Sequence, residues 1–201
     1  MVNPTHTYPP TTEPGPFNIN RYARIGLHEL SDGTFVNTSH GSPLPVFSHG
    51  EVFVHDGYAY HRDAYYASID GGATINMLLR TPAINEVHLV AYSATVTGGP
   101  SILSLLENVT VSADGTLVAP YNLNRTSSNT SGVFISENPT VSGGILIERH
   151  LIPAGHKDGG LSPNTSAGWV LKPSEEYCIR LTNNDSSAIS ASVEIMFYEE
   201  P

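Results

Sequence analysis

The sequence predicts an all-β fold, an antiparallel β-sandwich preceded by an extended, proline-rich N-terminal arm. Short runs of aliphatic, aromatic and β-branched residues recur along the chain, separated by glycine, proline, asparagine and aspartate. Several of these runs alternate between apolar and polar residues, as strands with one buried face do. Charged residues make up only 14% of the chain, and the helix formers lysine, glutamine and glutamate are scarce.

Length and charge exclude several classes of protein. The chain has 201 residues, enough for one well-filled core without disulfides or metals. Its formal net charge of −10 leaves no electropositive stripe for a phosphate backbone, so we expect no direct nucleic-acid binding. No run approaches the ~20 apolar residues of a membrane span and no secretion signal opens the chain, so we expect a soluble protein without membrane contact. The single cysteine, Cys178, excludes an internal disulfide framework.

Residues 1–50 form the predicted arm, and residues 51–201 the predicted jelly-roll-like domain. Seven prolines stand among threonine, asparagine and glycine in the arm, and proline opposes helices and central strands. Such a segment buries little apolar surface alone, so we expect it to order on contact with neighbouring subunits. Within the arm, Phe17 and Tyr22 are the predicted interface residues.

The first half of the domain predicts five strands. Aromatic and β-branched residues on either side of Asp56-Gly57 predict two strands joined by a turn. Residues 75–79 alternate before a proline ends the run and predict a half-buried strand. Residues 87–96 are apolar on both parities, which predicts a strand covered on both faces, central or at a subunit contact. Residues 102–111 fit helical spacing as well as alternation, and we choose a strand because threonine and valine end the run.

The second half alternates more regularly. Ile145, Ile147 and Leu151 share one parity, while Glu148 and His150 share the other, so the isoleucine row is expected to face the core. With the remaining runs the chain has roughly eight strands, which favours a jelly roll over the immunoglobulin-like sandwich that stays open as an alternative. The remaining runs are residues 133–135, 169–171, 177–182 and 192–197.

One histidine cluster contains residue types that bind zinc or manganese. On a continuous strand His55, His61 and Asp63 would share a face, with Asp56 beside them. Gly57 is expected to break that strand, and no two of the histidines stand two or four apart. We therefore interpret these residues as loop and rim positions and predict no metal site.

No other motif predicts catalysis or a cofactor. His150, His156 and Asp158 flank a glycine-rich stretch that lacks phosphate-binding spacing and is read as a surface loop. Cys178 shares a face with Arg180, which could lower its pKa, but a buried structural thiol is the preferred interpretation. There is no serine nucleophile elbow. The adjacent acids Glu175-Glu176 and Glu199-Glu200 would point to opposite faces of a strand and form no local glycosidase pair. Asn-x-Ser/Thr triplets are attributed to the composition of the chain. They begin at Asn37, Asn108, Asn124, Asn129, Asn164 and Asn184.

The polar loop that follows Pro120 is the predicted contact site of the domain. Tyr121 and Arg125 combine broad area with directional donors, as interface anchors do, and Asn124 can adapt to a partner's polar groups. An ordinary loop held by its own asparagine side chains is the alternative. The predicted protein interface therefore consists of Phe17 and Tyr22 in the arm and Tyr121, Asn124 and Arg125 in this loop.

Residues 108–116 and 122–130 carry a family resemblance. They read Asn-Val-Thr-Val-Ser-Ala-Asp-Gly-Thr and Asn-Leu-Asn-Arg-Thr-Ser-Ser-Asn-Thr, and they resemble a group of tailed-bacteriophage structural proteins. The resemblance continues through residues 168–174, 177–183 and 193–198 and covers about residues 55–200. Its members are small virion proteins, often encoded near the major capsid protein and usually taken as capsid decoration, cement or head-fibre components.

The resemblance implies a jelly-roll-like homotrimer on the outer capsid surface of the virion, assembled in the host cytoplasm and bound to the major capsid protein without catalysis. A second hypothesis is a fibre or receptor-binding module whose tyrosines stack on a host glycan. A third is a cupin-like metal enzyme, which would need histidines and a carboxylate pointing inward from neighbouring strands. The tyrosines of the second hypothesis are Tyr58, Tyr60, Tyr65 and Tyr66.

Overall fold

The structure is a computed structural model that describes residues 27–29, 35–37, 49–153, 159–160 and 168–201. The chain divides into two units, Met1–Ser48 and His49–Pro201. In the first unit, strands β1 (Leu27–Glu29) and β2 (Phe35–Asn37) pair antiparallel. The predicted arm therefore contains a short hairpin, while Phe17 and Tyr22 lie outside the described residues.

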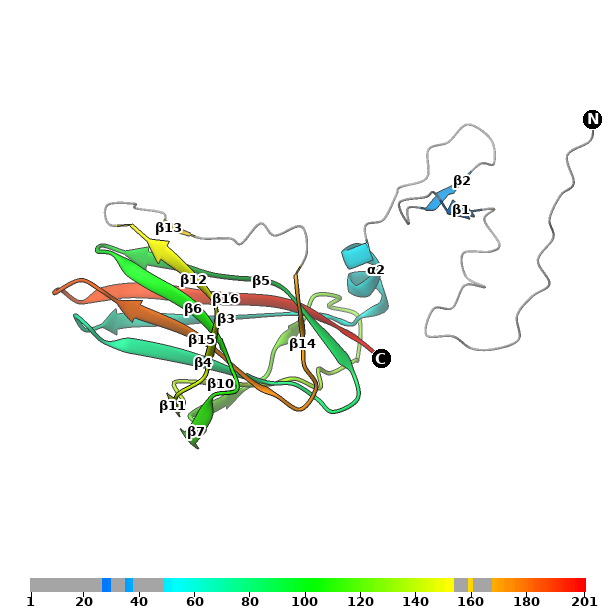
Figure 1. The fold of residues 1–201 in the computed structure, drawn as a ribbon. Helices are drawn as coiled ribbons and strands as arrows, with labels where there is room; N and C mark the ends of the chain where they lie inside the picture. Colours follow the sequence, from blue (N-terminus) through cyan, green and yellow to red (C-terminus); the bar gives the residue numbers. More distant parts are fainter. Residues whose placement is uncertain (1–26, 30–34, 38–48, 154–158, 161–167) are drawn as a thin grey trace, which may run out of the picture. The chain divides into compact units, whose positions relative to one another are not determined.

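The second unit begins with helix α2 (His49–Asp56) and continues as two packed antiparallel sheets (Figure 1). The strands are β3 (Ala59–Ile69), β4 (Thr74–Arg80), β5 (Glu86–Thr97), β6 (Ser101–Glu107), β7 (Thr110–Ala113), β8 (Thr116–Val118), β9 (Tyr121–Asn122), β10 (Phe134–Glu137), β11 (Thr140–Ser142), β12 (Ile145–Ile152), β13 (Gly159–Gly160), β14 (Trp169–Leu171), β15 (Glu176–Asn183) and β16 (Ile189–Glu200).

Eight of these strands follow the order of a jelly roll. One sheet, called sheet I, runs β12-β6-β15-β4-β10-β8, and the other, sheet II, runs β13-β5-β16-β3-β9 with β14 also paired to β5. The core strands of sheet I are thus β4-β15-β6-β12, and those of sheet II are β3-β16-β5-β14. Strands from the two ends of the domain interleave in both sheets, as in two nested Greek keys. The predicted antiparallel sandwich is confirmed, with jelly-roll rather than immunoglobulin-like order.

The main core lies between the two sheets. Ile179 and Leu181 of β15 face inward from sheet I, and Ile195 and Phe197 of β16 face inward from sheet II, all at most 1% exposed. Burial of each such side chain stabilises the fold by about 1.5–3 kcal/mol. The alternation predicted for these two strands is confirmed.

The strand predicted before Gly57 is wrong, because residues 49–56 form α2. Gly57 ends the helix at φ 79°, and its N–H donates to the Val54 carbonyl at 3.2 Å. The next N–H, that of Tyr58, donates to the Phe53 carbonyl at 2.8 Å, which completes a Schellman motif. Phe53 is 4% exposed and stacks on Tyr198 with ring centroids 4.2 Å apart. A helix end and a hairpin turn both use glycine with positive φ, so the dipeptide alone did not separate them.

Strand β5 is apolar on both parities because it contains a bulge. Its pairing with β16 skips Val90, so Leu89 faces the core before the bulge and Tyr92 faces it afterwards. An extra residue shifts the inward parity by one. The prediction of a strand covered on both faces is therefore wrong, whereas its central position is confirmed, because β5 pairs with β16 on one side and with β13 and β14 on the other.

Strand β12 contains a similar irregularity. Its pairing with β6 jumps from Leu146 to Glu148, which makes Ile147 the extra residue. Beyond the jump, Glu148 and His150 lie opposite inward-facing residues of β6, and Leu151 is 64% exposed. The predicted inward row is therefore wrong for Leu151 and for Ile145, which is 58% exposed, and holds only for Ile147, which is half-buried against the main core.

Residues 108–144 form an excursion between β6 and β12. The run predicted as one strand at 102–111 is two strands, β6 and β7, because Asn108 adopts φ 55° between them. Strands β7 and β11 pair with each other, while β8 and β10 extend sheet I beyond β4. Valines of this excursion cover a second, smaller core on the outer face of sheet I. That core consists of Leu78, Leu106, Val109 and Cys178, with Val111 and Val141 against it.

Candidate interaction surface

The asparagines of the polar loop bind the protein's own backbone. Asn124 Nδ2 donates to the His55 carbonyl at 2.8 Å, and its Oδ1 accepts from the Thr126 N–H at 3.1 Å. Asn122 Nδ2 donates to the Gly57 carbonyl at 2.8 Å. These contacts hold the loop against the last turn of α2, the arrangement expected of a loop ordered by its own amides.

Tyr121 and Arg125 are two of the exposed members of that loop. The Tyr121 side chain is 51% exposed, and the guanidinium carbons of Arg62 and Arg125 lie 5.7 and 5.8 Å from its ring centroid. Arg62 is fixed in turn by a 2.6 Å ion pair with Glu137, which joins the two sheets. The ring is thus held by cation–π contacts while one side stays accessible. Its role as an interface anchor stays a prediction.

The predicted histidine cluster is dispersed. His55 and Asp56 end α2, whereas His61 and Asp63 lie on the outer face of β3, where His61 Nε2 is 3.0 Å from a Glu194 carboxylate oxygen. Across the described part of the chain, no three His, Cys, Asp or Glu side chains are placed to hold a metal ion. His156 and Asp158 of the other cluster lie outside the described residues.

Glu148 joins the edges of the two sheets. Its Oε2 accepts hydrogen bonds from Tyr92 Oη at 2.8 Å and Trp169 Nε1 at 3.0 Å, both from sheet II. His150 Nε2 lies 2.9 Å from Oε1, without the alignment of a hydrogen bond. Burial alone would raise the pKa of Glu148, but the Trp169 and Tyr92 hydrogen bonds and the nearby imidazole hold it below its ordinary value. The cluster fastens one edge of the sandwich.

Cys178 is a buried structural thiol. It is 0% exposed in the smaller core, and its Sγ donates to Asn76 Oδ1 at 3.4 Å. Burial raises its pKa to about 11, which outweighs the opposite effect of Arg180. The thiolate is therefore a minor species near neutral pH.

The four tyrosines proposed for glycan stacking do not form one surface. Tyr60 and Tyr66 are buried in the main core, and Tyr58 is half-buried. Tyr65 is 69% exposed on the outer face of β3. A stacking platform built from the whole set is excluded, because two of its members face the core.

Large apolar side chains are exposed on β12 and β14, the strands at one end of the two sheets. Five of the ten exposed large apolar residues in the described part of the chain belong to these two strands, with exposed fractions of 40–64%. The Glu148–Trp169 hydrogen bond joins the two strands across the sandwich. We call this set the β12–β14 edge. It comprises Ile145, Leu146, Leu151, Trp169 and Val170.

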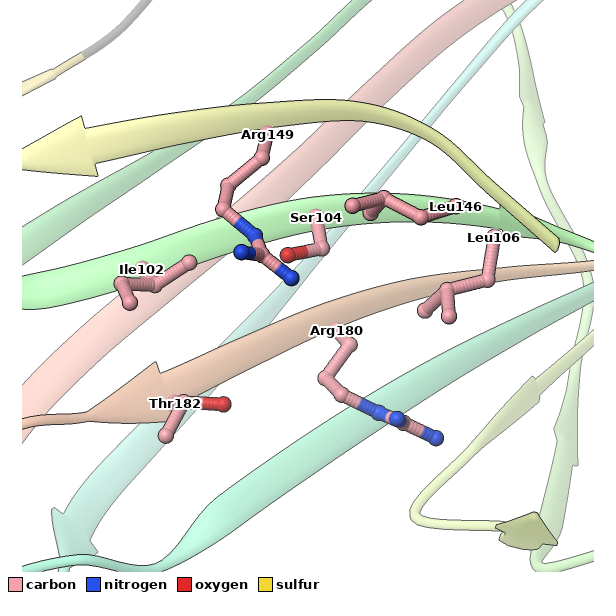
Figure 2. Close-up of a pocket in the computed structure, with 7 residues that line it drawn as sticks. All are labelled: Ile102, Ser104, Leu106, Leu146, Arg149, Arg180 and Thr182. Atoms are coloured by element: carbon pink, nitrogen blue, oxygen red, sulfur yellow. The ribbon is translucent and has the colours of Figure 1, made fainter. Parts of the chain in front are cut away.

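A shallow groove of about 280 Å³ lies beside this edge on the outer face of sheet I (Figure 2). Cross-strand register places Arg149 of β12, Ser104 of β6 and Arg180 of β15 in one row, with Ser104 in the middle. Aliphatic side chains line the rest of the groove. We call it the arginine groove. Its lining residues are Ile102, Ser104, Leu106, Leu146, Arg149, Arg180 and Thr182.

Sequence reasoning missed the arginine groove. Arg180 was recognised as an outward residue of its strand, but Arg149 and Ser104 carry no motif. The three residues become neighbours only through the pairing of β6 with both β12 and β15. Alternation shows which side of a strand a residue occupies, whereas strand order decides which residue lies beside it.

Comparisons with known proteins add little to this description. No protein-family model matches the chain, and no curated protein matches it. Among solved structures, the chain is similar to the crystal structure of the Yersinia pseudotuberculosis-derived mitogen (YPM), with a TM-score of 0.35 and 14% identity. The match covers 67% of this chain and 84% of the mitogen chain. The fold assignment here rests on the strand order. Within the described residues, no helix has the length and apolar character needed to cross a bilayer.

Proposed function

We propose that this protein is a non-enzymatic virion structural protein, a homotrimer that decorates the outer surface of a tailed-phage capsid by binding the major capsid protein lattice. The resemblance of residues 55–200 to phage structural proteins supports the proposal. So does the jelly-roll body, whose interior is filled with apolar side chains instead of reactive groups.

The β12–β14 edge is the observation that carries the proposal. Five of the ten exposed large apolar side chains among the described residues lie on these two strands, and large exposed apolar surfaces mark contact sites in proteins. Among the described residues, strand β12 is also the last strand of sheet I, so one side of its backbone has no neighbour there within that sheet. An apolar edge of this kind is suited to contact with another polypeptide, where a specific interface buries about 800 Å² per partner.

Attachment can be tested on phage particles that encode this protein. We expect mass spectrometry of purified particles to find the chain in a fixed, high ratio to the major capsid protein. Absence from the particles would refute the proposal. A copy number of only a few per particle would favour a fibre or receptor-binding module instead.

The contribution of the edge can be tested with two matched variants. Leu151→Asp places a charge on the β12–β14 edge, where Leu151 is 64% exposed, and should abolish trimer formation or co-sedimentation with particles that lack the protein. Leu117→Asp places the same charge on β8, at the opposite end of sheet I, where Leu117 is 66% exposed. It should attach as the unmodified protein does. Equal behaviour of the two variants would show that the β12–β14 edge is not the contact.

A further inference from the structure

The arginine groove has an unbalanced charge. The chain carries a net charge of −10 and only nine lysines and arginines, yet two of these arginines line one groove that has no carboxylate in its lining. Two other arginines pair with acids, Arg62 with Glu137 and Arg80 with Asp114. The two guanidinium groups therefore make this groove locally positive on a protein whose net charge is negative.

The polar groups of the groove have free donors. Within the described residues, Arg149 and Ser104 form no ion pair or hydrogen bond through their side chains. Arg180 donates from Nε to Asn76 Oδ1 at 3.0 Å, which orients its guanidinium and leaves both Nη groups available. Figure 2 shows the Arg149 guanidinium over β6, beside Ser104, and the Arg180 guanidinium directed away from it, over β4. Arginine in this state binds carboxylates through paired N–H donors.

We propose that the arginine groove binds an acidic, extended polypeptide segment of a partner protein. The Cα atoms of Arg149 and Arg180 stand two strands apart, about 10 Å at the usual strand spacing, and the flexible side chains set where the two guanidinium groups meet a ligand. An extended chain rises about 3.1–3.4 Å per residue, so carboxylates two to three residues apart span this separation. The residues between the two acids would lie against the apolar side chains that line the groove, Ile102, Leu106 and Leu146.

A neighbouring hollow extends the same surface. It has a volume of about 360 Å³, shares Arg180 and Thr182 with the groove, and continues toward β11 past Asn76. Its lining also lacks carboxylates. A segment that crosses sheet I through both hollows would meet two arginines and a series of hydroxyl and amide groups, which suits polypeptide backbone better than a single small anion.

The inference rests on the proposed attachment function for the identity of the partner, but its chemistry can be tested directly. The probe is a capped eight-residue peptide of glycine, serine and valine with two glutamates three residues apart, and the reference peptide has glutamine at both positions. In NMR titrations of the full chain, the glutamate peptide should shift the amides of Ser104, Arg149 and Arg180. The glutamine peptide should not.

Variants identify the donors. Arg149→Gln and Arg180→Gln should each weaken binding of the glutamate peptide roughly fivefold, and raising the salt from 0.05 to 0.5 M should weaken it further. Lys172→Gln removes a cation that lines neither hollow and whose side chain is 64% exposed, and it should leave binding unchanged. Shifts that persist in both groove variants would overturn the inference, as would inorganic phosphate that competes fully at equal concentration, because the groove would then be a small-anion site.

Particle attachment separates this inference from the proposed function. If the unmodified protein attaches to particles and the Arg149→Gln/Arg180→Gln double variant attaches equally well, the groove inference fails and the proposed function stands. If the peptide binds the groove but the unmodified protein is absent from particles, the proposed function fails and the groove stands. A change in the oligomeric mass of the double variant would assign the groove to a second copy of the chain and overturn the inference.

Discussion

Glu148 is a half-buried carboxylate with three partners from different strands. It accepts from Tyr92 and Trp169 of sheet II while it belongs to β12 of sheet I, and His150 lies beside it. Hydrogen bonds to a charged group are worth more than neutral ones, so removal of the charge weakens both of them together. Glu148 therefore stabilises the contact between the two sheets at this edge.

Replacing this carboxylate should cost stability in a pH-dependent way. We expect Glu148→Gln to lower the free energy of unfolding by about 1–3 kcal/mol at pH 7. The pKa of Glu148 is depressed below the ordinary 4.5 in the folded state, so its contribution is complete above about pH 4.5 and is lost as the pH falls below that value. In urea denaturation, the free energies of unfolding of the unmodified protein and of Glu148→Gln should differ less at pH 3.5 than at pH 7.

Glu194→Gln is the control for that measurement. Glu194 also lies beside a histidine, His61, but its side chain is 52% exposed. We expect a change below about 0.5 kcal/mol at either pH, since exposed pairs contribute little. A loss as large as that of Glu148→Gln would mean that charge, and not the buried hydrogen bonding, causes the effect.

At the scale of elements, a few residues decide how strands and the helix present their side chains. The bulge at Val90 reverses the inward parity of β5, and the irregularity at Ile147 reverses that of β12. Gly57 ends α2 in a left-handed conformation. Each is a local backbone feature with consequences for the whole element.

The reversal in β12 predicts opposite behaviour of adjacent residues. Ile152 is 1% exposed, so Ile152→Ala should destabilise the protein by about 2–5 kcal/mol. Leu151, which the uninterrupted alternation would bury, is 64% exposed, and Leu151→Ala should change stability by less than about 0.5 kcal/mol. Chemical denaturation of the two variants at a concentration where both are in the same oligomeric state measures the difference. The reverse ranking would contradict the observed register.

Gly57 and Gly72 form a matched pair of glycines. Both adopt positive φ, 79° and 73°, but a methyl group at Gly57 would lie 2.2 Å from Ser127 Oγ, whereas nothing lies within 4 Å at Gly72. We expect Gly72→Ala to cost about 1 kcal/mol through backbone strain alone and Gly57→Ala to cost clearly more. Thermal or urea unfolding of both variants tests this. Equal losses would show that Ser127 moves aside without cost.

At the scale of the whole molecule, the jelly roll exposes two different surfaces near one edge. The β12–β14 edge is apolar, and the adjacent outer face of sheet I carries the arginine groove. Apolar edges suit permanent contacts, whereas charged grooves favour specificity and rapid association. The two surfaces can thus serve self-assembly and partner recognition separately.

Self-assembly predicts a defined mass in solution. We expect sedimentation equilibrium to give three times the chain mass of 21.5 kDa at micromolar concentration. Val170→Asp, at a position 56% exposed on β14, should shift the mass toward that of one chain, because a charge buried in an apolar contact is strongly unfavourable. A monomeric unmodified protein would contradict the expected trimer.

The sequence by itself determined the class of fold and the strands with uninterrupted alternation. In β15 and β16, period-2 patterning specifies the buried row without further information, because each residue's face follows from its position along the strand. Composition likewise determined the net charge of −10.

Only the tertiary structure decided the features that depend on backbone irregularities and on strand order. One extra residue at Val90 or Ile147 inverts a face, and the pairing of β6 with β12 and β15 brings Arg149, Ser104 and Arg180 together from distant segments. Hydrophobic periodicity is a local property of one strand, whereas bulges and neighbour choice are set by hydrogen bonding between strands far apart in sequence. The arginine groove depends on strand neighbours, and the exposure of Leu151 on the β12–β14 edge depends on the irregularity at Ile147, so the pattern of a single strand predicts neither.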